Sequence, residues 1–135
     1  MSGYRDLSFL LKNMEPVQVP GSFIFTKISG ETLETLGSSP ILVYREAEAI
    51  TVILTKEIAE AHSLPYESVW SLISLTVHSD LEAVGLLAKV TGILADAGIT
   101  TNVVSAYYHD HLFVPQQRVQ EALIILKNLS NSIVE

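Results

Sequence analysis

The chain has 135 residues, of which 48% are hydrophobic and 17% are charged, a composition too apolar for a disordered protein. So many apolar residues in a small chain predict that a partner covers part of the surface. The net charge is −7 and the eight lysines and arginines are scattered, which argues against nucleic acid or an anionic membrane as a partner. The chain has no cysteine, which excludes disulfides and thiolate chemistry. The apolar run at residues 7–11 is too short for a signal peptide, so we expect a cytoplasmic protein.

The N-terminal half predicts a series of short elements. A helix is expected over residues 7–14, and Pro16, Pro20 and Gly21 separate it from a strand over residues 22–27. The later elements of this half are a short helical stretch, a turn, a strand and a second short helix, expected over residues 31–36, 37–40, 48–54 and 58–61. The segment Ser63-Leu64-Pro65 marks the expected boundary between two units.

The C-terminal half has a clearer pattern. Apolar and polar residues alternate over residues 70–77, which predicts a strand with one buried face. Ser79 and Glu82 have the spacing of a capping box, which predicts that a helix starts there and runs to residue 97. Gly98 then stands where a helix ends in the left-handed conformation. A strand over residues 99–106, a turn at residues 108–110 and a strand over residues 111–114 complete a hairpin.

Two segments resemble a known family. Residues 84–90 (VGLLAKV) and residues 94–99 (LADAGI) are similar to the ACT domain, whose first helix opens on a glycine-containing turn. Residues 107–115 (YYHDHLFVP) resemble the ACT domains of aspartokinase-like regulatory regions and of cytosolic arginine sensors. The resemblance covers residues 70–129 and implies a ferredoxin-like βαββαβ unit.

A weak internal repeat extends this expectation to the first half. Residues 48–54 and 58–61 align with residues 109–115 and 119–122 at a constant offset of 61 (109 − 48 = 61). Earlier segments do not keep this offset, because the first half lacks about the length of the helix at residues 83–97. We therefore expect an α+β protein of two fused ferredoxin-like units, with helices on one face of an antiparallel sheet. Residues 1–64 would form the reduced unit and residues 65–135 the intact ACT domain.

The candidate ligand site lies between the expected helix start and the hairpin. Gly85 would let a ligand carboxylate approach the free N–H groups of a helix start, although a glycine there could equally serve close packing. Asp110 could pair with a ligand ammonium or guanidinium group while Tyr107 covers its apolar part, and the alternative for Asp110 is a turn residue. The resemblance implies ligand contacts by Ser79, Leu81, Glu82, Ala83, Val84, Gly85, Tyr107 and Asp110.

Catalysis and metal binding have weaker support. His78, His109 and His111 could hold a metal, but solvated turn histidines explain the pattern as well. Ser79 follows His78 without a third group to orient a base, so no nucleophile is indicated. Asp80 and Glu82 are explained as first-turn acids that complement the helix dipole. We expect no catalytic residue, metal ligand or cofactor.

The resemblance implies a regulatory role. In related ACT pairs the ligand lies between two units and its binding shifts their arrangement, so we expect a non-catalytic sensor of an amino acid or a similar metabolite. The alternatives are a structural or oligomerisation module with a vestigial pocket, and an enzyme that uses the histidines. The apolar run at residues 122–126 is too wide for one helical stripe, which together with the reduced first unit predicts a homodimer.

Overall fold

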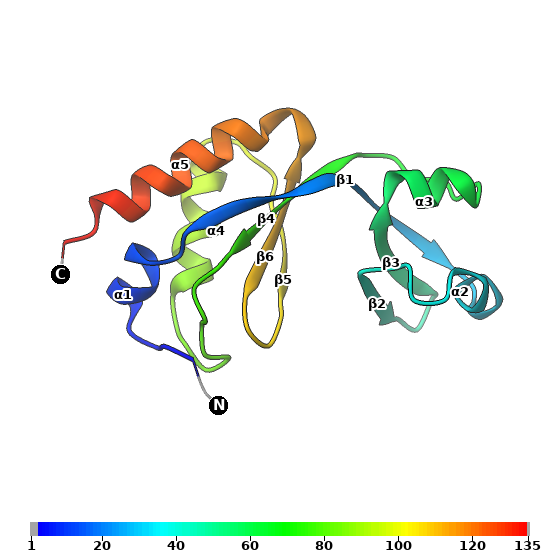
Figure 1. The fold of residues 1–135 in the computed structure, drawn as a ribbon, viewed down its shortest axis with the longest axis horizontal. Coiled ribbons are helices and arrows are strands. Elements are labelled where there is room, and N and C mark those ends of the chain that lie inside the picture. Colours follow the sequence, from blue (N-terminus) through cyan, green and yellow to red (C-terminus); the bar gives the residue numbers. More distant parts are fainter. Residues whose placement is uncertain (1–2, 135) are drawn as a thin grey trace. The chain divides into compact units, whose positions relative to one another are not determined.

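The computed structural model describes residues 3–134. Its helices and strands follow in the order α1 (Leu7–Lys12), β1 (Pro16–Ile28), α2 (Gly30–Leu36), β2 (Leu42–Arg45), β3 (Ile50–Thr55), α3 (Lys56–Ala61), β4 (Trp70–Leu75), α4 (Leu86–Asp96), β5 (Asn102–Ser105), β6 (Asp110–Pro115), the 3₁₀ turn η1 (Gln116–Arg118) and α5 (Val119–Ser132) (Figure 1).

The chain forms two compact units. The discontinuous unit combines the chain up to residue 20 with the chain from residue 71 onward, and the inserted unit comprises residues 21–70. The strand β1 runs through the boundary at Gly21, whose φ of +113° suits glycine. The expected division at residues 64/65 therefore does not separate the compact units. The division of the sequence into two repeats, residues 1–64 and 65–135, stays a prediction.

The inserted unit contains the elements of a βαββα pattern. Strand β3 lies between β1 and β2, and both pairs are antiparallel, with Ile28 opposite Ile50 and Arg45 opposite Ile50 in the two registers. Ser29 caps α2 by accepting from the Thr32 N–H, and Thr55 caps α3 by accepting from the Ile58 N–H. The buried apolar residues of this unit form one cluster, made of Ile24, Ile28, Leu36, Val52, Leu54 and Ala59.

In the discontinuous unit the strand order is β1–β4–β6–β5. Strand β5 pairs antiparallel with β6, with Ser105 opposite Asp110. Read along the chain, β4, α4, β5, β6 and α5 form a βαββα series, and residues 16–20 of β1 add the last strand of the ferredoxin-like sheet. Because these residues serve as a strand, Pro16 and Pro20 do not separate α1 from β1 as expected, but lie within β1.

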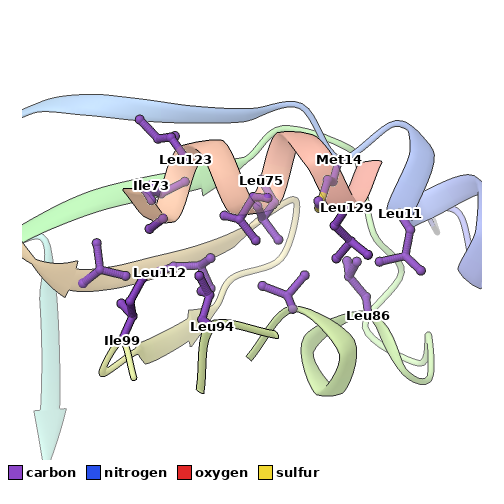
Figure 2. Close-up of a cluster of buried hydrophobic side chains, with 14 of the residues drawn as sticks. Leu11, Met14, Ile73, Leu75, Leu86, Leu94, Ile99, Leu112, Leu123 and Leu129 are labelled. Carbon is purple, nitrogen blue, oxygen red and sulfur yellow. The ribbon is translucent and has the colours of Figure 1, made fainter. Parts of the chain in front are cut away.

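One hydrophobic core joins the three helices of the discontinuous unit to its sheet. Figure 2 shows side chains from α1, α4 and α5 meeting those of β4 and β6. Among the contributors are Leu11, Ile73, Leu94, Leu112 and Leu126. The helices thus pack on one face of the sheet, as expected from the sequence. In α5, Leu126 is fully buried. Ile124, on the opposite side of the helix, is 59% exposed.

Helix α4 ends as the sequence predicts. Gly98 has a φ of +72°, and its N–H donates to the Ala95 carbonyl while the Ile99 N–H donates to the Leu94 carbonyl. These two bonds form a Schellman motif, with Ile99 packed back into the core. No helix within residues 3–134 is long and apolar enough to span a membrane.

Candidate ligand site

The loop after β4 is held by the N-terminal segment. Tyr4 donates its N–H to the His78 carbonyl at 2.9 Å, and its own carbonyl accepts from the Asp80 N–H at 2.9 Å. Tyr4 and Ser79 thereby form a parallel bridge. Gly3 lies so close that an added Cβ would stand 2.4 Å from the His78 carbonyl oxygen. The loop is therefore fixed by residues that lie about seventy positions earlier in the chain.

The predicted capping box at residues 79–82 is wrong. Helix α4 begins at Leu86, with Gly85 at its N-cap and a φ of +105°. In the loop, Asp80 Oδ1 accepts from the Glu82 N–H at 2.7 Å, so the side chain of Asp80 stabilises a turn instead of a helix. Asp80 and Glu82 consequently precede the helix and are not its first-turn acids.

A cavity of about 140 Å³ lies between this loop, the start of α4 and the hairpin. On the side of the loop, the cavity is lined by Ser79, Leu81 and Ala83. Gly85, the N-cap of α4, also lines it. Residues 86–88 complete the helix wall. The first intrahelical bond of α4 runs from the Lys89 N–H to the Gly85 carbonyl, so the N–H groups of residues 86–88 have no acceptor within the helix. This wall is polarised to receive a negative group.

Asp110 supplies the negative wall of the cavity. It is the first residue of β6, only 8% exposed, and it lines the cavity with Ser105 and Ala106. Among residues 3–134, its carboxylate makes no salt bridge or side-chain hydrogen bond. Asp110 is therefore in the strand and faces the cavity, whereas the sequence placed it in the turn.

Asp80 is the second carboxylate that lines the cavity. It is also buried, and Arg5 Nε lies 3.4 Å from its Oδ1. The hydrogen bond from the Glu82 N–H holds the pKa of Asp80 below its ordinary value, and Arg5 lowers the pKa further. Of the two acids in the cavity wall, Asp80 is thus compensated by the protein and Asp110 is not.

The structure brings together five of the eight predicted site residues. Glu82, Val84 and Tyr107 do not line the cavity. Glu82 pairs instead with Arg5 at 2.9 Å, Val84 is 83% exposed, and Tyr107 packs edge-on against Tyr108. The five that line it are Ser79, Leu81, Ala83, Gly85 and Asp110. Sequence reasoning missed the cavity-lining residues Asp80, Leu86, Leu87, Ala88, Ser105 and Ala106. Only Asp80 had a recognisable signal, as a turn-forming acid beside Ser79.

The histidines lie in separate contacts. His111 Nδ1 lies 2.7 Å from Ser74 Oγ, and burial, followed by the nearby His109, lowers the pKa of His111. His78 packs against Tyr108, with ring centroids 5.0 Å apart. Within the described part of the chain, no group of three histidines or carboxylates is placed to hold a metal ion.

The inserted unit has an open depression at the corresponding place. It has a volume of about 480 Å³ and is lined by the end of β1, the start of α2 and the β2–β3 turn, including Lys27, Ser29 and Ile50. Strands β3 and β6 correspond at an offset of 60 residues (110 − 50 = 60 and 115 − 55 = 60). The predicted offset of 61 was therefore one residue too long, and Ile50 stands where the other unit has Asp110.

Comparison with known families gives two matches. A model described as an ACT domain matches residues 2–71, and a second ACT-domain model matches residues 67–128. No curated protein matches the chain.

Solved structures match over most of the chain. A Vibrio cholerae protein described as a possible transport protein is 40% identical, with a TM-score of 0.82, over 92% of this chain and 95% of that one. An Agrobacterium tumefaciens protein is 20% identical, with a TM-score of 0.67, over 85% of this chain and 87% of that one. The regulatory subunit of aspartate kinase from Thermus thermophilus is 10% identical, with a TM-score of 0.63, over 84% of this chain and 96% of that one. The last two similarities concern the fold.

Proposed function

The chain belongs to the ACT-domain family, whose members are typically regulatory amino-acid-binding modules, and on that premise we propose that it is a non-catalytic sensor of an amino acid or a similar small metabolite. The proposed site is the cavity of the discontinuous unit, with contacts from Ser79, Leu81, Ala83, Gly85 and Asp110. Glu82, Val84 and Tyr107 would join only when a ligand rearranges the loop and the hairpin turn. A cytoplasmic location stays a prediction.

The observation that carries this proposal is the carboxylate of Asp110. Asp110 is only 8% exposed and its carboxylate has no ion pair within residues 3–134, yet no fully buried side-chain oxygen there lacks a partner, so this carboxylate keeps its solvent contact in the cavity and is open to a ligand ammonium group. The start of α4 lines the same cavity and offers N–H groups suited to a ligand carboxylate. An α-amino acid has its ammonium and carboxylate groups bonded to the same carbon atom, which fits a small cavity with one positive and one negative wall.

A second candidate is an oligomerisation module, and exposed apolar residues favour it. Leu81, Val84, Tyr107 and Tyr108 are all more than half exposed in the loop and hairpin beside the cavity. Ile124 is exposed on α5. A two-fold homodimer that covers such residues is compatible with sensing, because a ligand bound near an interface is linked to association. A protein that served only as an oligomerisation module would require no ligand.

A thermal-shift screen of the free amino acids separates the two functions. We expect one or a few amino acids to stabilise the protein, by ~2.7 kcal/mol at a hundred times the Kd. Titration calorimetry on each hit confirms direct binding. No stabilisation at millimolar concentration, with calorimetry in agreement, would reject the sensor and favour the module.

A further inference from the structure

The N-terminal segment contributes a charge to the candidate site that neither the family match nor the loop sequence indicates. Arg5 reaches two carboxylates of the loop, with Nε 3.4 Å from Asp80 Oδ1 and an Nη atom 2.9 Å from Glu82 Oε2. The Asp80 side chain is 6% exposed and lines the cavity, whereas the Arg5 side chain is 60% exposed and lies outside it. Arg5 thus acts on the cavity from behind the loop.

The backbone fixes this arrangement. The two hydrogen bonds between Tyr4 and residues 78 and 80 place Arg5 beside Asp80. The segment lies close against the loop at both of its ends. A Cβ added to Gly3 would clash with His78, and a Cβ added to Gly85 would stand 3.2 Å from Leu7 Cδ2. Asp6 then caps α1 by accepting from the Phe9 N–H, so the segment cannot slide along the loop without losing these contacts.

The charges of the cavity follow from this placement. Asp80 and Asp110 both line it, and both are more than nine-tenths buried. Arg5 compensates Asp80, which leaves the Asp110 carboxylate as the uncompensated charge of the wall. A single negative group is matched by one ligand ammonium. Two uncompensated carboxylates would favour a ligand with an additional positive charge.

We propose that Arg5 is a specificity-determining residue that sets the charge of the site, so that the native cavity prefers amino acids with an uncharged side chain over dibasic ones. This inference rests on the proposed function and deepens it. Arg5 acts through Asp80 and is a positioning residue, not a ligand contact. The N-terminal segment is therefore a functional part of the site in the discontinuous unit.

The test compares norleucine with lysine, whose side chains share the same four-carbon chain, to which lysine adds a terminal ammonium group. Calorimetry gives the two Kd values for wild type, Arg5→Ala, Arg5→Lys and Arg5→Ala with Asp80→Asn. We expect wild type to prefer norleucine, and Arg5→Ala to shift the ratio toward lysine by about tenfold. Arg5→Lys should keep most of the wild-type ratio. The double variant should restore it, because it removes the uncompensated carboxylate.

Arg45→Ala is the matched control. It changes the net charge by the same amount but lies in β2 of the inserted unit, so the ratio should stay at the wild-type value. Hydrogen exchange of the amides in residues 78–82 is measured in parallel, and faster exchange in Arg5→Ala is expected while the melting curve stays cooperative.

An unchanged ratio in Arg5→Ala would overturn the inference, whatever the exchange rates. So would a shift of equal size in Arg45→Ala, because it would show an effect of overall charge. If neither probe binds any variant while another amino acid stabilises the wild type, the charge rule fails and the sensor function stands. If no amino acid stabilises the wild type, the sensor function itself fails.

Discussion

Replacing Asp110 by asparagine keeps the shape of the side chain and removes its charge. In the ligand-free protein the residue Asp110 is 8% exposed and its carboxylate has no ion pair within residues 3–134, so removal of the charge breaks no salt bridge. We therefore expect the free energy of unfolding without ligand to stay the same or to rise. An asparagine in the same place also avoids the cost of holding a charge in a largely buried residue.

The effect on binding should have the opposite sign. A hydrogen bond between a ligand ammonium and a carboxylate contributes roughly 1.5–3 kcal/mol, which corresponds to about a ten- to hundredfold weaker Kd. Titration calorimetry with the amino acid found in the screen measures this change, and urea unfolding measures stability. Asp96→Asn, an exposed change at the end of α4, is the matched control and should alter neither quantity.

Two results would refute the reasoning. Unchanged affinity in Asp110→Asn would mean that the carboxylate does not meet the ligand. A large loss of stability without ligand would mean that Asp110 holds the hairpin, as a turn residue would.

Three further predictions concern the loop, acid stability and assembly. Gly85→Ala should destabilise the fold by about 1–3 kcal/mol, because Gly85 has a φ of +105°. Gly92 lies inside α4 with open space around it, so Gly92→Ala should stabilise the fold by about 0.5–1 kcal/mol. Equal effects of the two changes in urea unfolding would contradict this reasoning. The pKa of Asp80 is lowered in the folded state, so its contribution is present above its unfolded pKa of 3.8 and is lost as the pH falls through the lower folded value. Urea unfolding over this pH range should show a smaller loss in Asp80→Asn, and an identical loss would exclude the role of Asp80. Ile124→Asp, on the outside of α5, should dissociate a homodimer in light scattering without lowering the melting temperature of the monomer, and a wild-type monomer at micromolar concentration would reject the dimer.

Local signals in the sequence predicted much of the discontinuous unit. The alternation along β4 and the glycine after α4 describe interactions between residues a few positions apart, and they predict the strand and the helix end correctly. Strand β5 was predicted too long, because Ile99 belongs to the Schellman motif and the strand starts only at Asn102. The apolar run in α5 was assigned to two surfaces, and the structure places Leu126 in the core and Ile124 outside.

The parts that failed depend on distant contacts. Ser79 and Glu82 have the spacing of a capping box. In the structure, however, Ser79 forms a bridge with Tyr4 and Glu82 pairs with Arg5, and no local pattern in the sequence reveals these contacts. The repeat offset was one residue too long, and in a strand such a slip exchanges the two faces. The offset of 61 aligns Ile50 with His111 instead of Asp110. It therefore does not reveal that the cavity of the discontinuous unit has an acid where the depression of the inserted unit has an isoleucine.

The most direct test of the central claim is an NMR titration of the wild-type protein with the amino acid that stabilises it. If the cavity of the discontinuous unit is the binding site, the largest amide shifts will fall on residues 79–88 and 105–110, with saturation at one ligand per chain. Shifts confined to residues 27–30 and 46–50 would place the ligand in the depression of the inserted unit and contradict the account.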